Sequence, residues 1–223
     1  MTPVIEFLGE RALLVQMGEC IDSEVNARAT ALAAALRAAR LPGVLDVAPA
    51  YASVCVRHAP LARERLVAAL AAFVQSTPAN PGPAHAQVDI PVCYGGEFGP
   101  DLDNVAQHAQ LTAREVIDRH TAAEYRVAML GFAPGFPYLL GLDAALNTPR
   151  RASPRTRVPA GSVAIGGAQT GIYPSDLPGG WNLIGRMPLR LFDAERDPPA
   201  LLAPGTRVRL RAIDADEFAE LSR

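Results

Sequence analysis

Lysine is absent from this chain of 223 residues, so all 21 basic side chains are arginines. The absence excludes a P-loop lysine, a Schiff-base lysine and a lysine that carries biotin or lipoate. No apolar run is long enough to span a bilayer. The first residues carry Glu6, Glu10 and Arg11 within their apolar stretch and do not resemble a signal peptide. We therefore expect a cytoplasmic protein with no membrane partner.

Cysteines and metal-binding patterns are also sparse. The three cysteines, Cys20, Cys55 and Cys93, are far apart and form no C-x-x-C motif, which favours reduced thiols. The four histidines show neither an H-E-x-x-H motif nor a cysteine at zinc spacing. We expect no metal site, and we expect the histidines at the surface or at helix ends. A net charge of −2 gives no indication of nucleic-acid binding.

Glycine and proline are concentrated in one stretch. Between Gly131 and Pro188 lie ten of the 18 glycines, eight of the 20 prolines and the only tryptophan. Disordered segments lack the aromatic and branched residues that are interleaved here. Proline fixes φ, and glycine permits positive φ or close backbone approach. The stretch therefore predicts rigid turns between short strands that form one wall of a binding cleft.

The patterning divides the chain in two. Residues 1–78 alternate two strands, a helix, two strands and a helix, which predicts a small α+β domain of ferredoxin-like type. Residues 79–87 are rich in proline, glycine and alanine and predict a linker. Residues 88–223 have two short helices, the second with a Thr112/Glu115 capping box, and then closely spaced strands typical of a β-barrel or sandwich. The expected strands from the linker onward are Gln87–Tyr94, Arg126–Leu130, Val158–Ala164, Gln169–Ile172, Asn182–Arg186, Leu189–Phe192 and Thr206–Ala212.

An arginine cluster lies among prolines at residues 150–157. Arg150, Arg151, Arg155 and Arg157 present planar guanidiniums, which bind carboxylate or phosphate in a bidentate manner. The cluster is either an anion site or a solvated loop at the rim of an interface. For Arg155, which follows Pro154, we favour a functional role.

The segment GGAQTGIYP at residues 166–174 offers glycine N–H groups that could hold an oxyanion. It matches neither the P-loop nor the dinucleotide motif, and a hairpin with a glycine-rich turn explains it as well. Gln169 and Tyr173 are its polar members. Ser162 stands in P-A-G-S-V-A rather than G-x-S-x-G, which argues against a nucleophile elbow. The nearby aromatics, Phe132, Phe136, Tyr138 and Trp181, form either a pocket lip, a docking surface or a buried plug.

Three motifs in order carry a family likeness: GFAPGFPYL at 131–139, PRTRVPAGSVAIGGAQTGIYP at 154–174 and PGGWNLIGR at 178–186. Together they resemble the KipI family, which includes the PxpB component of bacterial 5-oxoprolinase and is also labelled allophanate hydrolase subunit 1. A related module lies in the carboxyltransferase region of urea carboxylases. One departure is visible, because the family usually has G-R-T-P where this chain has Met187 as the third residue.

The resemblance implies an α+β N-terminal domain followed by a mainly-β, cyclophilin-like barrel. It also implies a subunit, inactive alone, of an ATP-dependent complex that converts 5-oxo-L-proline to L-glutamate. The implied partners are a KipA-type (PxpC) subunit, which would share the site, and a LamB/YcsF-type (PxpA) subunit. ATP would act in the complex, with no metal or biotin attached to this chain. Two alternatives stay open: a KipI-type inhibitor of a sensor histidine kinase, and a carboxyltransferase half that requires a separate biotinylated chain.

Opening a lactam through phosphorylation of its amide oxygen needs cationic and N–H donors around developing negative charge. The donors that we expect to act catalytically are Arg155, Gln169 and Arg186. The residues expected to bind substrate or an anion are Arg151, Ser162, Gly166, Gly167, Gly171 and Tyr173. Those expected at the pocket or partner interface are Phe132, Phe136, Tyr138 and Trp181.

Overall fold

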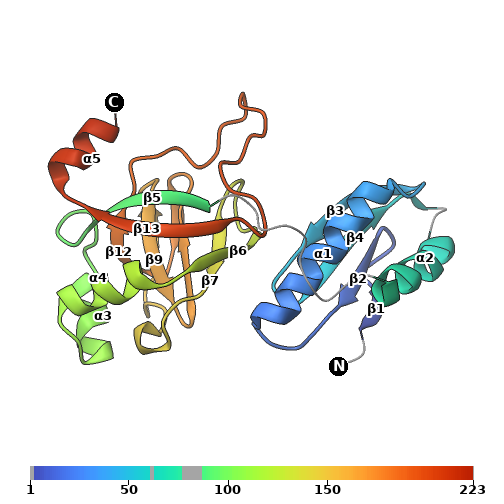
Figure 1. The fold of residues 1–223 in the computed structure, drawn as a ribbon, viewed down its shortest axis with the longest axis horizontal. Coiled ribbons are helices and arrows are strands. Elements are labelled where there is room, and N and C mark those ends of the chain that lie inside the picture. The colour runs from blue at the N-terminus through green and yellow to red at the C-terminus, as the bar shows by residue number, and fades with distance from the viewer. Residues whose placement is uncertain (1–2, 61–62, 77–86, 223) are drawn as a thin grey trace. The chain divides into compact units, whose positions relative to one another are not determined.

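A computed structural model describes residues 3–60, 63–76 and 87–222 (Figure 1). The chain separates into two compact units, residues 1–84 and 85–223, each with its own core. The expected linker at 79–87 lies outside the described residues except for Gln87, which begins a strand. Within the described ranges, no helix is both long and apolar enough to cross a membrane, and no three His, Cys, Asp or Glu side chains cluster as metal ligands would.

The first unit is a four-stranded antiparallel sheet with two helices. Its elements are β1 (Val4–Phe7), β2 (Ala12–Gln16), α1 (Ser23–Ala39), β3 (Val44–Pro49), β4 (Ser53–His58) and α2 (Arg63–Ser76). Asp22 starts α1 by accepting hydrogen bonds from the backbone N–H groups of Glu24 and Val25, both at 2.9 Å. The buried faces of β2 and β4 meet α1 and α2 in a core that includes Leu13, Val56, Leu32 and Leu70.

The elements of this unit follow the order that the sequence predicted, with two strands, a helix, two strands and a helix. The strand order is β1-β2-β4-β3 and all neighbours are antiparallel. Tight turns join β1 to β2 and β3 to β4, with Leu8 and Ala50 donating to the carbonyls of Ala12 and Ser53. The connection from β2 through α1 to β3 crosses over β4, which lies between these two strands in the sheet. A ferredoxin-like domain runs βαββαβ, whereas here each helix follows a complete hairpin.

The second unit is a closed seven-stranded barrel, so the expected barrel fold is confirmed. Around the barrel the order is β10-β7-β6-β13-β5-β12-β9, and β13 runs parallel to β5 while the other pairs are antiparallel (Figure 1). Its strands are β5 (Gln87–Tyr94), β6 (Tyr125–Leu130), β7 (Pro137–Leu140), β9 (Ser162–Gly166), β10 (Gln169–Ile172), β12 (Asn182–Arg186) and β13 (Arg207–Ile213). A separate ribbon pairs β8 (Arg155–Val158) with β11 (Leu177–Gly179).

Four helices accompany the barrel: α3 (Leu102–Ala109), α4 (Ala113–Ala122), the 3₁₀ helix η2 (Ala144–Leu146) and α5 (Ala215–Leu221). The structure contains the Thr112/Glu115 capping box at the start of α4. Helix α3 packs on β12 and α4 on β13, close to one another. Alternate strand residues such as Val92, Val127 and Ile184 fill the barrel interior.

A second apolar cluster lies on the outer side of the barrel wall. Along β9, Val163 and Ile165 face the main core, whereas Ala164 between them belongs to a cluster with Phe136 and Trp181. Because side chains alternate along a strand, the two clusters lie on opposite faces of the wall. The remaining buried members are Val158, Tyr173 and Leu183. Much of the glycine- and proline-rich stretch therefore forms an added layer over the barrel.

Two strand expectations were wrong. Val158–Ala164 is not one strand, because Pro159 and Gly161, the latter with φ +79°, break it between β8 and β9. Leu189–Phe192 is no strand either. Leu191 is buried there, and Phe192 makes only an isolated bridge to Ala200. An apolar segment can bury its side chains from an irregular loop, so apolarity alone misled the assignment.

The expected surface position is also wrong for two histidines, because His58 and His120 are completely buried. His120, on α4, lies 2.8 Å from the hydroxyl of Tyr94 and 3.1 Å from Oγ1 of Thr170. Thr170 donates its own proton to the carbonyl of Ala164 at 3.0 Å. His120 must then donate through Nε2–H and accept through Nδ1, as a neutral imidazole. Burial lowers the pKa of His120 to about 3.

Candidate functional site

Asp101 is a buried carboxylate that two arginines hold. It directly precedes α3 and is 4 % exposed. Its Oδ1 accepts from Nη1 of Arg151 at 2.8 Å and from Nη2 of Arg155 at 2.9 Å. Its Oδ2 accepts from Nη1 of Arg155 and from the backbone N–H of Leu183, both at 2.8 Å. The four donors occupy the usual acceptor positions of the carboxylate.

This arrangement, which we call the Asp101 clamp (Asp101, Arg151 and Arg155), has two consequences. It ties the arginine-bearing loop to α3 and β12, and the backbone N–H of Arg151 adds a 2.7 Å bond to the carbonyl of Gly180. Two guanidiniums share one carboxylate, so the clamp keeps one positive charge. Nε of Arg151 is buried and has no hydrogen-bond partner within the described ranges. The clamp can therefore still attract an anion.

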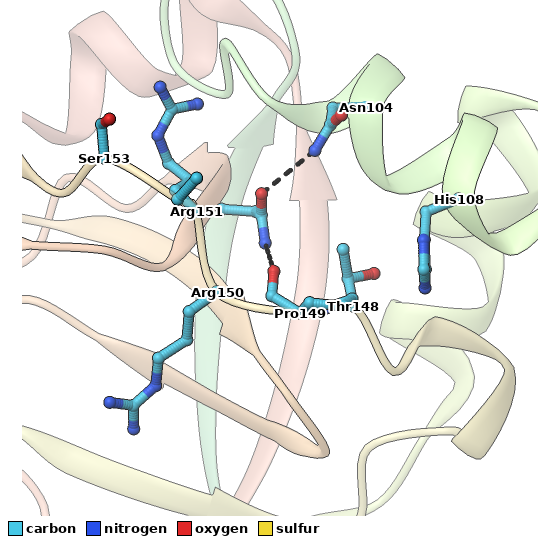
Figure 2. Close-up of a pocket in the computed structure, with 9 residues that line it drawn as sticks. Asn104, His108, Thr148, Pro149, Arg150, Arg151 and Ser153 are labelled. Carbon is cyan, nitrogen blue, oxygen red and sulfur yellow. Dashed lines mark hydrogen bonds between the residues drawn. The ribbon is translucent and has the colours of Figure 1, made fainter.

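A pocket of about 540 Å³ opens beside the clamp, between α3 and the loop at 148–153. Asn182 is one of its lining residues and accepts from the side chain of Asn104 at 3.1 Å and donates to the carbonyl of Pro149 at 2.9 Å. Figure 2 draws both bonds as dashed lines, which end at Asn104 and Pro149. Figure 2 shows the side chains of Arg150 and Arg151 pointing away from each other. The lining residues are Asn104, His108, Thr148, Pro149, Arg150, Arg151, Ala152, Ser153 and Asn182. Amide, imidazole, hydroxyl and guanidinium groups thus meet in one concavity.

The outer aromatic cluster adjoins this pocket through Arg150. The guanidinium of Arg150 lies 5.8 Å from the centre of the Trp181 ring, within the range of a cation–π contact. Trp181 contacts Phe136 and Tyr138 edge-on, each at a centroid distance of 5.8 Å. The hydroxyl of Tyr173 accepts a hydrogen bond from the Trp181 backbone, and burial raises the pKa of Tyr173. Trp181 and Phe136 are therefore core anchors, with exposed fractions of 6 % and 2 %.

Phe132 is the exception within this group. Its side chain is 60 % exposed and its φ is +68°, a left-handed conformation that a bulky residue rarely adopts. Its ring contacts Phe136 and Tyr173 edge-on at 5.4 and 6.3 Å. Such strain persists where the surroundings impose it, often at binding sites. Of the four aromatics, Phe132 best fits the expected pocket lip or docking surface.

The structure explains the glycines of the 166–174 segment by packing and turn geometry. A Cβ on Gly166 would lie 2.5 Å from the Trp181 ring, and one on Gly171 would lie 3.0 Å from the Phe136 ring. Gly167 has φ +64° in the β9–β10 turn, and its N–H donates to the carbonyl of Thr148 at 2.7 Å. Anion binding by these glycines stays a prediction.

The other predicted residues lie apart from the pocket. Gln169 begins β10 and is half-exposed. Ser162 and Arg186 are direct neighbours across β9 and β12. Oγ of Ser162 and Nε of Arg186 are buried without hydrogen-bond partners in the described part of the chain, and Arg186 lies 5.7 Å from the Phe98 ring. Of the predicted catalytic and substrate-binding residues, only Arg151 lines the pocket, together with Arg150 of the arginine cluster.

Sequence reasoning missed Asp101, Asn104, His108 and Asn182. Asp101 has the sequence context of a helix start and does precede α3, but its side chain makes no capping bond. The only sequence signal for Asp101 was the arginine cluster, which requires an anion nearby. Asp101 supplies that anion, although it lies some 50 residues earlier in the chain.

Comparisons with known proteins place this architecture in one class. Residues 3–202 match the family described as carboxyltransferase domain, subdomain C and D. The barrel and the α+β unit therefore belong to the class of carboxyltransferase subdomains. The chain is 42% identical to the 5-oxoprolinase B subunit of Bacillus subtilis (strain 168), covering 96% of this chain and 94% of that protein. It is 58% identical to the corresponding 5-oxoprolinase component of Escherichia coli O157:H7 over 122 residues, which are 55% of this chain and 56% of that protein.

A solved structure extends the likeness to three dimensions. The crystal structure of TTHA0988 superposes with a TM-score of 0.83 at 42% identity, over 92% of this chain. That match spans only 41% of the TTHA0988 chain. The chain belongs to the carboxyltransferase subdomain C and D family and, within it, to the KipI group that contains the 5-oxoprolinase B subunits.

Proposed function

We propose that the chain is the B subunit of an ATP-dependent 5-oxoprolinase, which opens 5-oxo-L-proline to L-glutamate. The observation that carries the proposal is the 42% identity to a 5-oxoprolinase B subunit over nearly the full length of both chains. The matching region of TTHA0988 is part of a longer chain, which supports a fold that works with further protein segments. The proposed partners are a KipA/PxpC-type and a LamB/YcsF (PxpA)-type subunit.

The chemistry explains why such an enzyme consumes ATP. The lactam nitrogen donates into the carbonyl, which makes the carbonyl carbon a poor electrophile. Transfer of the γ-phosphoryl group from ATP to the amide oxygen releases ADP and removes that resonance. Water then adds to the carbon, and the ring C–N bond breaks as the nitrogen takes up a proton, which leaves an acyl phosphate. A second water hydrolyses the acyl phosphate to glutamate and inorganic phosphate. Cationic side chains stabilise the phosphoryl charge as it develops. This chain has no P-loop lysine, so we assign the nucleotide to a site in the complex that a partner completes.

The pocket beside the Asp101 clamp supports a substrate-binding contribution. Arg150 is exposed and forms no ion pair among the residues that the structure describes, so its charge is available to a substrate carboxylate. The Asn104 amide and the His108 imidazole offer polar partners for a lactam. Both terminal nitrogens of Arg155 bind Asp101. We therefore propose that Arg155 positions the loop, while the catalytic roles of Gln169 and Arg186 depend on surfaces outside this pocket.

Reconstitution tests the proposal. The three purified subunits are combined with 5-oxoproline and ATP, and glutamate and ADP are measured with each subunit omitted in turn. We expect ATP-dependent glutamate release from the full set and none from this chain alone. Undiminished release without this chain would remove it from the enzyme. Arg155→Ala at the wild-type rate in the full complex would remove Arg155 from the proposed site.

A carboxyltransferase half is a second candidate, which the name of the matching family favours. Carboxyl transfer from carboxybiotin requires a biotinylated lysine, and this chain has no lysine to modify. The biotin would have to come from another chain. Addition of avidin to the reconstituted complex separates the two candidates, because only the carboxyltransferase would lose activity.

A further inference from the structure

Arg150 differs from the other members of the arginine cluster in how its charge is paired. Two members bind Asp101 in the clamp, and Arg157 donates to Asp176 at 2.7 Å. Arg150 is exposed and forms no hydrogen bond or ion pair with any residue that the structure describes. A planar guanidinium without a carboxylate of its own chain suits a carboxylate from outside. The cluster thus leaves one arginine for a ligand.

The backbone of Arg150 is fixed on both sides. Just before it, Thr148 and Gly167 exchange two backbone hydrogen bonds, of 3.3 and 2.7 Å. Just after it, the N–H of Arg151 donates to the carbonyl of Gly180 at 2.7 Å. A side chain that starts from a fixed backbone loses less conformational freedom when it binds. The loop therefore presents Arg150 at a defined place on the pocket.

The side chain of Arg150 is oriented by the face of Trp181, with the guanidinium carbon 5.8 Å from the ring centre. An aromatic face attracts a guanidinium, and the two planar groups can stack. The indole ring is itself fixed, because Phe136 and Tyr138 contact it edge-on and Gly166 leaves no room for a side chain beside it. Trp181 therefore acts as a rigid support for the charge of Arg150.

The surroundings of Arg150 favour an anion over a neutral ligand. Burial raises the pKa of Tyr138 and of Tyr173, and the positive charge of Arg150 opposes both rises. No aspartate or glutamate is among the lining residues that the structure describes, whereas Arg150 and Arg151 both line the pocket. The carboxylate of Asp101, next to the pocket, is already shared by two guanidiniums. A neutral ligand would leave the charge of Arg150 without a partner.

We propose that Trp181 positions Arg150 to bind the substrate carboxylate, and that this pair makes the pocket select carboxylate-bearing amides over neutral amides. The inference rests on the proposed function and deepens it, because it names the class of substrate that the pocket accepts. Arg150 contacts the substrate, whereas Trp181 is a positioning residue that acts through Arg150.

Trp181 emission tests the binding preference without turnover. The full chain is titrated with 5-oxo-L-proline and with 2-pyrrolidinone, which has the same ring without the carboxylate. Sodium chloride at equal ionic strength is the reference, and calorimetry gives each affinity independently of emission. Because Trp181 is the only tryptophan, a carboxylate on Arg150 should change the emission in a saturable manner. We expect 2-pyrrolidinone to bind at least about tenfold more weakly, since it lacks the charge-assisted contact.

Two arginine variants isolate the contribution of Arg150. Arg150→Gln should remove the preference for 5-oxo-L-proline over 2-pyrrolidinone. Arg190→Gln is the matched control, because Arg190 is exposed, pairs with Asp193 and is not among the residues that line this pocket. It should keep the preference of the wild type.

Steady-state kinetics of the reconstituted complex test the positioning role of Trp181. Trp181→Leu should raise KM for 5-oxo-L-proline about threefold to tenfold, with little change in kcat or in KM for ATP. Trp181→Phe keeps an aromatic face and should recover much of this rise. The inhibition constant of 2-pyrrolidinone should not change, because a neutral lactam does not use Arg150. General damage to the fold would alter all of these constants together.

The inference is overturned if both lactams bind the wild type equally, if Arg150→Gln keeps the preference, or if Trp181→Phe recovers nothing relative to Trp181→Leu. Failure of the proposed function gives a different result. A complete complex that releases no glutamate would refute the 5-oxoprolinase proposal, and the titrations would still decide the binding preference. ATP-dependent release that Arg150→Gln leaves unchanged would retain the proposed function and remove this inference.

Discussion

Asp101 shows at the scale of one residue how the arginine-bearing loop is held. We expect Asp101→Asn to lower the free energy of unfolding by about 2–3 kcal/mol, because a buried charge pair would lose its acceptor. This loss of stability is smaller than is usual when a fully buried ion pair is broken. The side chains of Arg151 and Arg155 are 34% and 25% exposed and can recover some hydration. Urea unfolding measures the change.

The neighbouring aspartate supplies the control for this substitution. Asp103 lies in the first turn of α3 and is exposed, so Asp103→Asn should change stability by less than about 0.5 kcal/mol. If Asp101→Asn cost no more than Asp103→Asn, the clamp would not be holding the loop.

At the scale of single residues, the sequence indicated that the arginine cluster suits an anion, but it did not indicate that Asp101 is the partner. Four arginines among prolines predicted an anion site or a solvated loop, and in the structure Arg151 and Arg155 bind a carboxylate of the same chain. Binding of an external anion by the cluster stays a prediction. Nothing in local spacing connects Asp101 to residues some 50 positions later, because only closure of the barrel brings α3 beside that loop. Gly166 is similar, since the Trp181 ring that forbids a side chain there comes from a different part of the chain.

Helix α4 meets the barrel through His120, and this contact makes stability depend on pH. The pKa of His120 is lowered to about 3, against 6.5 for an ordinary histidine, because the imidazole is buried. The unfolded chain therefore binds a proton between these values that the folded chain does not bind. Stability should fall as pH falls through this window, by about 1.4 kcal/mol per unit. Between pH 7.5 and pH 5, we expect a loss of about 2 kcal/mol from this group.

Urea unfolding across that interval isolates the histidine, because most carboxylates titrate below it. His120→Gln should be less stable than the wild type at pH 7.5. Its free energy of unfolding should lack the part of the pH dependence that His120 causes. His108→Gln removes an exposed histidine from the adjacent helix and should keep the slope. Equal slopes for the wild type and His120→Gln would show that the imidazole is not held neutral.

Elements were predictable where local chemistry defines them. Alternation and turn residues predicted β5, β10 and β12 with the bounds that the structure shows, and the capping box marked the start of α4. The β8–β11 ribbon was missed because its strands have three or four residues and face a cluster outside the barrel. Short strands that pack on an outer layer lack the alternation that identifies a barrel wall.

At the scale of the molecule, two hydrophobic cores form without sharing a residue. One core draws only on residues of the first unit, and the barrel core and outer aromatic cluster draw only on the second. A domain with its own core can fold alone. The change from α/β patterning to closely spaced strands indicated this division. Closure of seven strands into a barrel depends on the pairing of β9 with β10 and of β13 with β5, which only the structure shows.

We therefore expect residues 85–223 to fold as an isolated fragment. Trp181 is the only tryptophan and lies in the outer aromatic cluster, so its fluorescence reports on this unit alone in both the fragment and the full chain. The urea midpoint of Trp181 emission should agree between the two proteins within about 0.5 M, since the contacts that bury Trp181 are all retained. Far-UV circular dichroism of the full chain reports the unfolding of both units together. Its urea midpoint therefore need not equal the midpoint of Trp181 emission. A fragment that aggregates, or whose midpoint falls by more than about 1 M, would show that the first unit stabilises the barrel.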